Sequence, residues 1–169
     1  MKDVAYDKVI TDKEYKQSII SGWVKAKGYD LSVCTISSKT LKLSLNLVYG
    51  TFDVFKEFIQ KEHGKEIKFD NAEALYLQVD DKDCAWNFIL IQSMDWTAND
   101  YGVICHELHH FTHYGLEEKG VTYGTGGEEV YAYVQGHFME LVVRAFVELK
   151  KVIDNKKNAK HRVKGNSRK

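Results

Sequence analysis

The chain has 169 residues, of which 44% are hydrophobic and 28% charged, a composition typical of one folded domain that excludes disorder throughout. No apolar run approaches the length of about 18 residues that crosses a bilayer, and the first residues resemble no secretory leader, so we expect a soluble, cytoplasmic protein that does not bind membranes. The three cysteines, Cys34, Cys84 and Cys105, form no even-numbered disulfide framework, which is typical of a reducing compartment.

The net charge of zero is the sum of two oppositely charged parts. Residues 150–169 contain nine Lys or Arg and a single acid, Asp154, whereas residues 1–149 contain 15 basic and 23 acidic residues. Beyond residue 154 almost no apolar residue is left to bury, so we expect a mobile basic tail over 155–169. Such a tail can attract nucleic acid, or it can be an ordinary solvated terminus.

Two patterns stand out in the first fifty residues. A capping box at 11–14 precedes apolar residues at helical intervals, which predicts a helix over 12–27 that Gly28 ends. Leucines then alternate with polar residues over 41–47, and this period of two predicts a half-buried strand that runs to Tyr49.

A short helix and a pair of strands are expected next. Thr51 can cap the helix and Gly64 can end it, and four apolar residues fall on one face of it: Phe52, Phe55, Phe58 and Ile59. Apolar runs over 74–79 and 86–92 predict two strands, and the polar connector between them has the length of a hairpin loop. We expect these strands to be antiparallel.

Two long helices complete the predicted fold. Thr97 is the expected N-cap of a helix over 98–114, and a second helix is expected over 127–155, with a glycine-rich loop at 115–126 between them. This order predicts an α+β fold, a small antiparallel or mixed sheet of about three strands packed on helices. All of it belongs to a single domain over 1–154.

The first long helix contains the sequence His106-Glu107-Leu108-His109-His110, an HExxH motif. Residues four apart lie one helical turn apart, about 6 Å, so His106 and His110 can both bind one zinc ion at about 2.0–2.1 Å. Glu107 is rotated by about 100° from His106 and can act on a metal-bound water as general base. The motif therefore predicts one catalytic zinc ion.

Catalytic zinc usually has three protein ligands, so a third is needed. Glu128 and Glu129 begin the second long helix, and Glu129 follows His110 by 19 residues. We favour Glu129, because it shares a helical face with Gly136, where a close approach of the two helices is possible. In the alternative interpretation both carboxylates only stabilise the helix N-terminus through its dipole.

Other histidines, cysteines and tyrosines near the motif are further candidates to bind the metal or to line the cleft. His113 lies about 10 Å along the axis from His106, too far to join it on one ion in a straight helix, so it more plausibly lines the cleft. His109 and His113 form a second i, i+4 pair that can bind metal adventitiously. Cys84 and Cys105 are expected to be inert thiols. Three residues are candidates either to line the cleft or to stabilise an oxyanion: His113, Tyr133 and His137. Tyr123 and Tyr131 lie near the same helix start and are further candidates.

The HExxH motif followed by Glu129 on a second helix resembles the gluzincin group of zinc metallopeptidases. The chain is also similar, over about 45–146, to the compact HExxH metallopeptidases encoded by bacteriophages and prophages. The resemblance implies a minimal zincin-like fold, His106, His110 and Glu129 as zinc ligands, and Glu107 as general base. It also implies that the strand over 86–92 is the sheet edge that binds substrate.

The expected function is therefore that of a zinc-dependent hydrolase, a metallopeptidase that acts on a peptide or protein in the cytoplasm, which would be the bacterial host's if a phage encodes it. Two alternatives belong to other classes. One is a non-catalytic zinc protein that binds a partner protein of phage or host, and the other is a nucleic-acid binder that uses the basic tail. The sequence predicts neither the cleavage specificity nor the oligomeric state.

Overall fold

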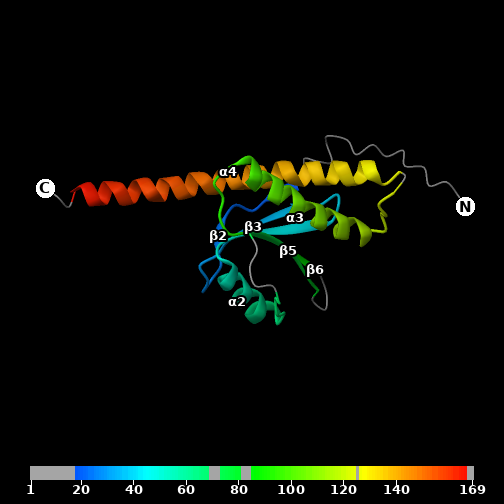
Figure 1. Cartoon of the computed structure of the whole chain (residues 1–169), viewed down its shortest axis with the longest axis horizontal. Coiled ribbons are helices and arrows are strands. Elements are labelled where there is room, and N and C mark those ends of the chain that lie inside the picture. Colours follow the sequence, from blue (N-terminus) through cyan, green and yellow to red (C-terminus); the bar gives the residue numbers. More distant parts are fainter. Residues whose placement is uncertain (1–17, 69–72, 81–84, 125, 167–169) are drawn as a thin grey trace, which may run out of the picture.

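The computed structural model describes residues 18–68, 73–80, 85–124 and 126–166, with side chains through Asp154. These residues form one sheet and three helices (Figure 1). The strands are β1 (Ser18–Ile20), β2 (Val24–Lys25), β3 (Ser32–Ser38), β4 (Leu43–Tyr49), β5 (Ala74–Asp80) and β6 (Ala85–Ile91). The helices are α2 (Phe52–His63), α3 (Ala98–Glu117) and α4 (Glu128–Asn166).

The sheet has six strands in the order β1-β3-β4-β6-β5, and β2 also pairs with β3. β4 and β6 are parallel and connected through α2 and β5, whereas the other pairs are antiparallel. The α+β class agrees with the prediction, but the expected number of about three strands was wrong. The largest omission is β3, which pairs with β4 along its whole length and whose short polar side chains weaken its apolar pattern.

The helix predicted over 12–27 is also wrong for the residues that the structure describes; 12–17 lie outside them. β1 and β2 replace it, and Gly22 between them has a φ of 76° that favours glycine. Trp23 packs against the ring of Phe146 on α4 and donates its indole N–H to the carbonyl of Ala145 at 2.6 Å. Pairing with β3 and these contacts outweigh the local helical period.

Helices cover both faces of the sheet (Figure 1). On one face, Leu45, Leu47 and Ile89 pack with core residues of α3 and α4, including Phe111 and Phe138. On the other face lies α2, whose core residues are Phe52, Phe55 and Ile59, together with Val48 and Leu90 of the sheet. β4 is therefore a central strand with little solvent exposure, not the half-buried strand expected.

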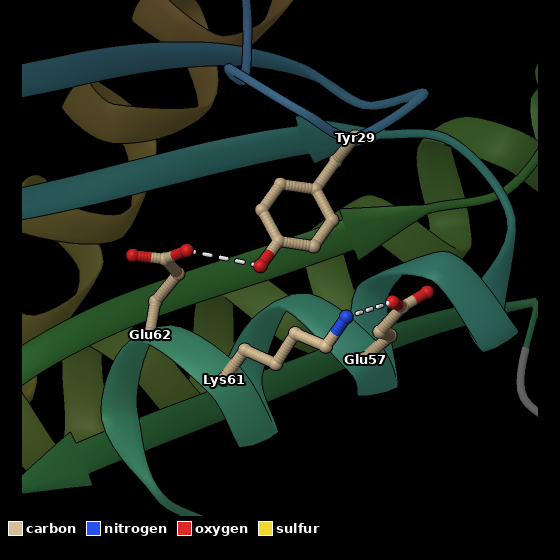
Figure 2. A network of polar contacts seen from close by, with 4 residues as sticks. All are labelled: Tyr29, Glu57, Lys61 and Glu62. Atoms are coloured by element: carbon tan, nitrogen blue, oxygen red, sulfur yellow. Dashed lines mark hydrogen bonds and ion pairs between the residues drawn. The ribbon is translucent and has the colours of Figure 1, made fainter.

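The short helix α2 was predicted correctly. Gly64 ends it in the left-handed region at a φ of 66°, although the side chain of Thr51 makes no capping bond. Its outer surface is joined to the turn before β3, where the hydroxyl of Tyr29 donates to Glu62 at 2.9 Å (Figure 2). On the same surface Lys61 pairs with Glu57 at 2.5 Å, which raises the pKa of Lys61.

The two long helices begin near the predicted residues and end later. Thr97 and Asp100 form a reciprocal capping box, and α3 continues to Glu117, three residues into the predicted loop. Gly115 lies so close to β4 that an added Cβ would be 2.9 Å from a methyl group of Leu43. α4 continues as a helix through Asn166, across most of the predicted mobile tail. No helix in the described part of the chain is long and apolar enough to cross a bilayer.

Candidate metal site on helix α3

Helix α3 lies between β5 and α4. Phe111 packs against Phe138 of α4 with ring centroids 4.8 Å apart, and the carbonyl of Cys105 accepts a hydrogen bond from Gln135 at 3.2 Å. The side toward β5 is polar, with Glu107 and His110 in contact with Tyr76. The HExxH motif therefore lies along the border between α3 and β5, away from the apolar contact with α4.

His106 and His110 direct their Nε2 atoms at each other. The two atoms are 3.2 Å apart, and the rings are nearly perpendicular, at 88°. Two nitrogens that bind a tetrahedral zinc ion at about 2.05 Å are about 3.3 Å apart, so this pair has the separation that zinc requires. Without metal, one neutral imidazole can donate to the other.

The ring of Tyr76 supports His110. Its centroid lies 6.3 Å from that of the imidazole, with the planes 16° apart, and 5.9 Å from that of Tyr114, with the planes 9° apart. The Tyr76 hydroxyl donates to Oδ1 of Asn87 at 2.8 Å, and burial raises the pKa of the phenol well above its ordinary value. A neutral, hydrogen-bonded tyrosine therefore holds one of the two candidate ligands in place.

Glu107 is almost buried, with 9% of its surface exposed. Its carboxylate accepts a hydrogen bond of 2.6 Å from the backbone N–H of Tyr76. This N–H points away from the sheet, because β5 is an edge strand that pairs on one side only, with β6, in the described part of the chain. The carboxylate that the motif predicts as general base is thus held by strand β5, not by α4.

The edge strand itself was assigned wrongly from the sequence. The strand over 86–92 corresponds to β6, which pairs with β4 on one side and β5 on the other. β5 is the strand at the edge beside α3, and two of its outward backbone groups, the N–H of Tyr76 and the carbonyl of Gln78, have partners. The carbonyl of Gln78 accepts from Lys65 at 2.7 Å, and the Gln78 side chain donates to Glu118.

Glu129 is exposed in the first turn of α4, as is Glu128. Tyr131 lies beside His113, with ring centroids 5.9 Å apart, so Glu129 lies toward the C-terminal end of α3, beyond His110. In the described ranges no three His, Cys, Asp or Glu side chains converge as a metal site. The structure therefore joins two of the three predicted ligands, and the role of Glu129 stays a prediction.

The remaining predicted residues have other surroundings. His109 and His113 stack at 6.3 Å and 19° without converging, and His113 lies 3.4 Å from Glu117. Tyr133 is exposed, whereas His137 contacts Ser18 of β1 at 2.9 Å. Burial lowers the pKa of His137. Tyr123 and Tyr131 pack together at the loop before α4, Cys105 is exposed, and Cys84 lies outside the described residues.

The sequence did not identify Tyr76 or Asn87 as part of the site. Tyr76 precedes Glu107 by 31 residues and belongs to an unremarkable apolar strand, so no local pattern distinguishes it. The sequence contains a weaker indication, since the first strand of a hairpin that is followed by a helix can lie against that helix. Only the sheet order, however, shows that β5 is the neighbour of α3.

Comparison with protein-family models, with curated proteins and with solved structures finds no match to this chain.

Proposed function

We propose that this protein is a zinc-dependent hydrolase that acts on peptide bonds, with His106 and His110 as zinc ligands and Glu107 as general base. The observation that supports the proposal is the 3.2 Å separation of the two Nε2 atoms, on a helix that also carries the almost buried Glu107. Two stacked or diverging imidazoles would not fit one ion, whereas this pair does.

When bound, zinc lowers the pKa of a coordinated water and polarises the carbonyl that the water attacks. Glu107 supplies a proton acceptor one residue from the first histidine, and its low exposure limits competition from bulk water. Before substrate binds, Tyr76 holds the carboxylate through its backbone N–H, and its ring stacks on His110.

An extended peptide can pair with β5, the only edge of the sheet next to α3 in the described fold. A peptide that pairs with β5 at Tyr76 needs the backbone N–H that now donates a hydrogen bond to Glu107. A peptide that takes this N–H therefore releases the carboxylate at the moment when substrate reaches the site. Binding of substrate and freeing of the base are then the same event.

A second candidate is a zinc protein without catalytic activity. It is favoured by the hydrogen bond of Glu107, since a carboxylate bound at 2.6 Å to the backbone can have a purely structural role at the sheet edge. In that case the histidine pair binds zinc, but a partner protein, not a substrate, uses this surface.

Zinc content and peptide hydrolysis, measured on the same preparation of untagged protein, separate the candidates. We expect one zinc ion per chain and turnover of a quenched-fluorescence peptide mixture. Glu107→Gln should retain zinc and lose at least about 100-fold in turnover, in line with the contribution of a general base. Glu117→Gln is the matched control, an exposed glutamate on the same helix, and should retain both.

Absence of zinc from the wild-type protein would overturn both candidates. Stoichiometric zinc without turnover would overturn the hydrolase and leave the non-catalytic protein. Full turnover in Glu107→Gln would contradict the role of this residue as base.

A further inference from the structure

Helix α4 has a packed part and a projecting part. Its core residues extend from Tyr131 to Leu149, and Ile153 is the last residue that packs against the core among the side chains described, which end at Asp154. The helix nevertheless continues to Asn166 and extends past the sheet and the other helices (Figure 1). At a rise of about 1.5 Å per residue, the projecting part is about 20 Å long.

Along one face of α4, the residue type changes from apolar to basic where the helix leaves the body of the protein. Val134, Phe138, Val142, Ala145, Leu149 and Ile153 follow each other at intervals of three and four residues and form the face toward the core. Continued at the same intervals, this line passes through positions 156, 160 and 164, and all three are lysines. Beyond the sheet, the helical positions that continue this apolar face are therefore occupied by lysine in the sequence.

The composition of the projecting part limits what can bind there. Between 154 and 166 there are five Lys or Arg and one acid, Asp154, and the only residues with apolar side chains are Ala159 and Val163. A helical partner or an inserted membrane face would need an apolar stripe, which two small residues do not supply. The remaining driving force is charge.

We propose that the projecting part of α4 binds the phosphate backbone of double-stranded nucleic acid. A duplex presents about one negative charge per 1.7 Å of its axis, and this line of charge suits lysine positions that recur at intervals of four residues along one helix. Contacts to phosphates fix position and are independent of base sequence. The inference does not depend on the zinc site, which lies on another helix.

Fluorescence anisotropy of full-length protein with a labelled 20-base-pair duplex tests the proposal. We compare Lys156→Gln/Lys160→Gln/Lys164→Gln with the matched control Lys27→Gln/Lys39→Gln/Lys119→Gln, which removes the same charge from exposed positions on the body. Glutamine preserves helix propensity, and circular dichroism checks that α4 is retained. The tail variant should bind at least about tenfold more weakly, and its plot of log K against log salt should be shallower by about 3, whereas the control should keep the wild-type slope.

Three results would overturn the proposal. One is the absence of duplex binding by the wild-type protein at low salt. The second is equal weakening by the two triple variants, which would indicate nonspecific attraction to the whole surface. The third is binding to phosphatidylserine vesicles without binding to the duplex. His106→Ala/His110→Ala should bind the duplex as the wild type does, and loss of binding there would instead assign the nucleic acid to α3.

Discussion

Helix α3 presents two pairs of histidines with the same i, i+4 spacing, and their geometries differ. His106 and His110 converge to an Nε2 separation of 3.2 Å with perpendicular rings. His109 and His113 lie nearly parallel, with ring centroids 6.3 Å apart. The helix backbone allows both arrangements, so the spacing alone does not decide which pair can hold a metal ion.

The difference comes from the neighbours of each pair. His110 lies against the fixed ring of Tyr76, whose hydroxyl is bound to Asn87. His113 is instead 3.4 Å from the exposed carboxylate of Glu117 on its own helix. Support from a strand orients a ligand, whereas contact with an exposed carboxylate on the same helix does not fix the ring of His113.

The largest expected effect is on zinc affinity. His106→Ala/His110→Ala should weaken zinc binding at least about 100-fold, because each substitution removes a ligand of one ion. His109→Ala/His113→Ala removes the same number of imidazoles from the same helix and should change the affinity less than twofold. Competition with a chromophoric chelator measures both. Equal losses in the two variants would show that the pairs are equivalent and would break the comparison.

The second effect concerns stability without metal. Glu107→Ala should lower the free energy of unfolding by about 2 kcal/mol, because it removes a charge-assisted hydrogen bond to the strand edge. Glu117→Ala, on the exposed side of the same helix, should stay within about 0.5 kcal/mol. Urea unfolding in excess chelator gives both values. If the two variants are equally stable, the bond between Glu107 and Tyr76 contributes nothing.

The third effect tests the support that Tyr76 gives to His110. Tyr76→Leu should weaken zinc binding about tenfold, the lower end of the range for residues that orient ligands. Tyr76→Phe keeps the stacked ring and loses only the hydroxyl, so it should restore most of the affinity. The backbone N–H that binds Glu107 is present in both variants, which separates the ring from the strand. Unchanged affinity in Tyr76→Leu would contradict an orienting role.

The smallest effect uses a histidine outside both pairs. Burial lowers the pKa of His137, followed by opposing effects of Glu140 and Arg144, so its stabilising contribution is complete above the ordinary histidine pKa. That contribution is lost as the pH falls below about 6.5, where the unfolded chain takes up the proton more readily. Unfolding measured at pH 7.5 and 5.0 should show a smaller loss in His137→Gln than in the wild type. Identical losses would mean that His137 does not contribute to the pH dependence.

Elements defined by local signals were predictable from the sequence. The capping box of Thr97 and the glycine after α2 marked helix ends, and the hairpin of β5 and β6 followed from two apolar runs with a polar connector. Residues 18–27 were not predictable in this way, since Ile20 and Trp23 fit a helix locally but reach the core from β1 and from the link between β1 and β2. The parallel pairing of Asn46 with Phe88 across α2 has no local signal at all.

In the candidate site, too, some features could be predicted from local spacing and others depend on the fold. The spacing of His106 and His110 sufficed to predict that they can meet, because helix geometry fixes their distance. The partner of Glu107 could not be predicted, since it depends on which strand lies at the sheet edge. The third ligand depends on how α4 is aligned along α3, which the helical period does not determine.

The capping box, the strand edge and the histidine pair all come from one stretch of the chain, residues 74–114. During synthesis on the ribosome this stretch is complete before any residue of α4 has been made. The two imidazoles and their support can therefore meet a metal ion while the apolar side of α3 is still uncovered. If the proposed site binds zinc, the order of zinc binding and of packing by α4 is then set during biosynthesis and leaves no trace in the final structure.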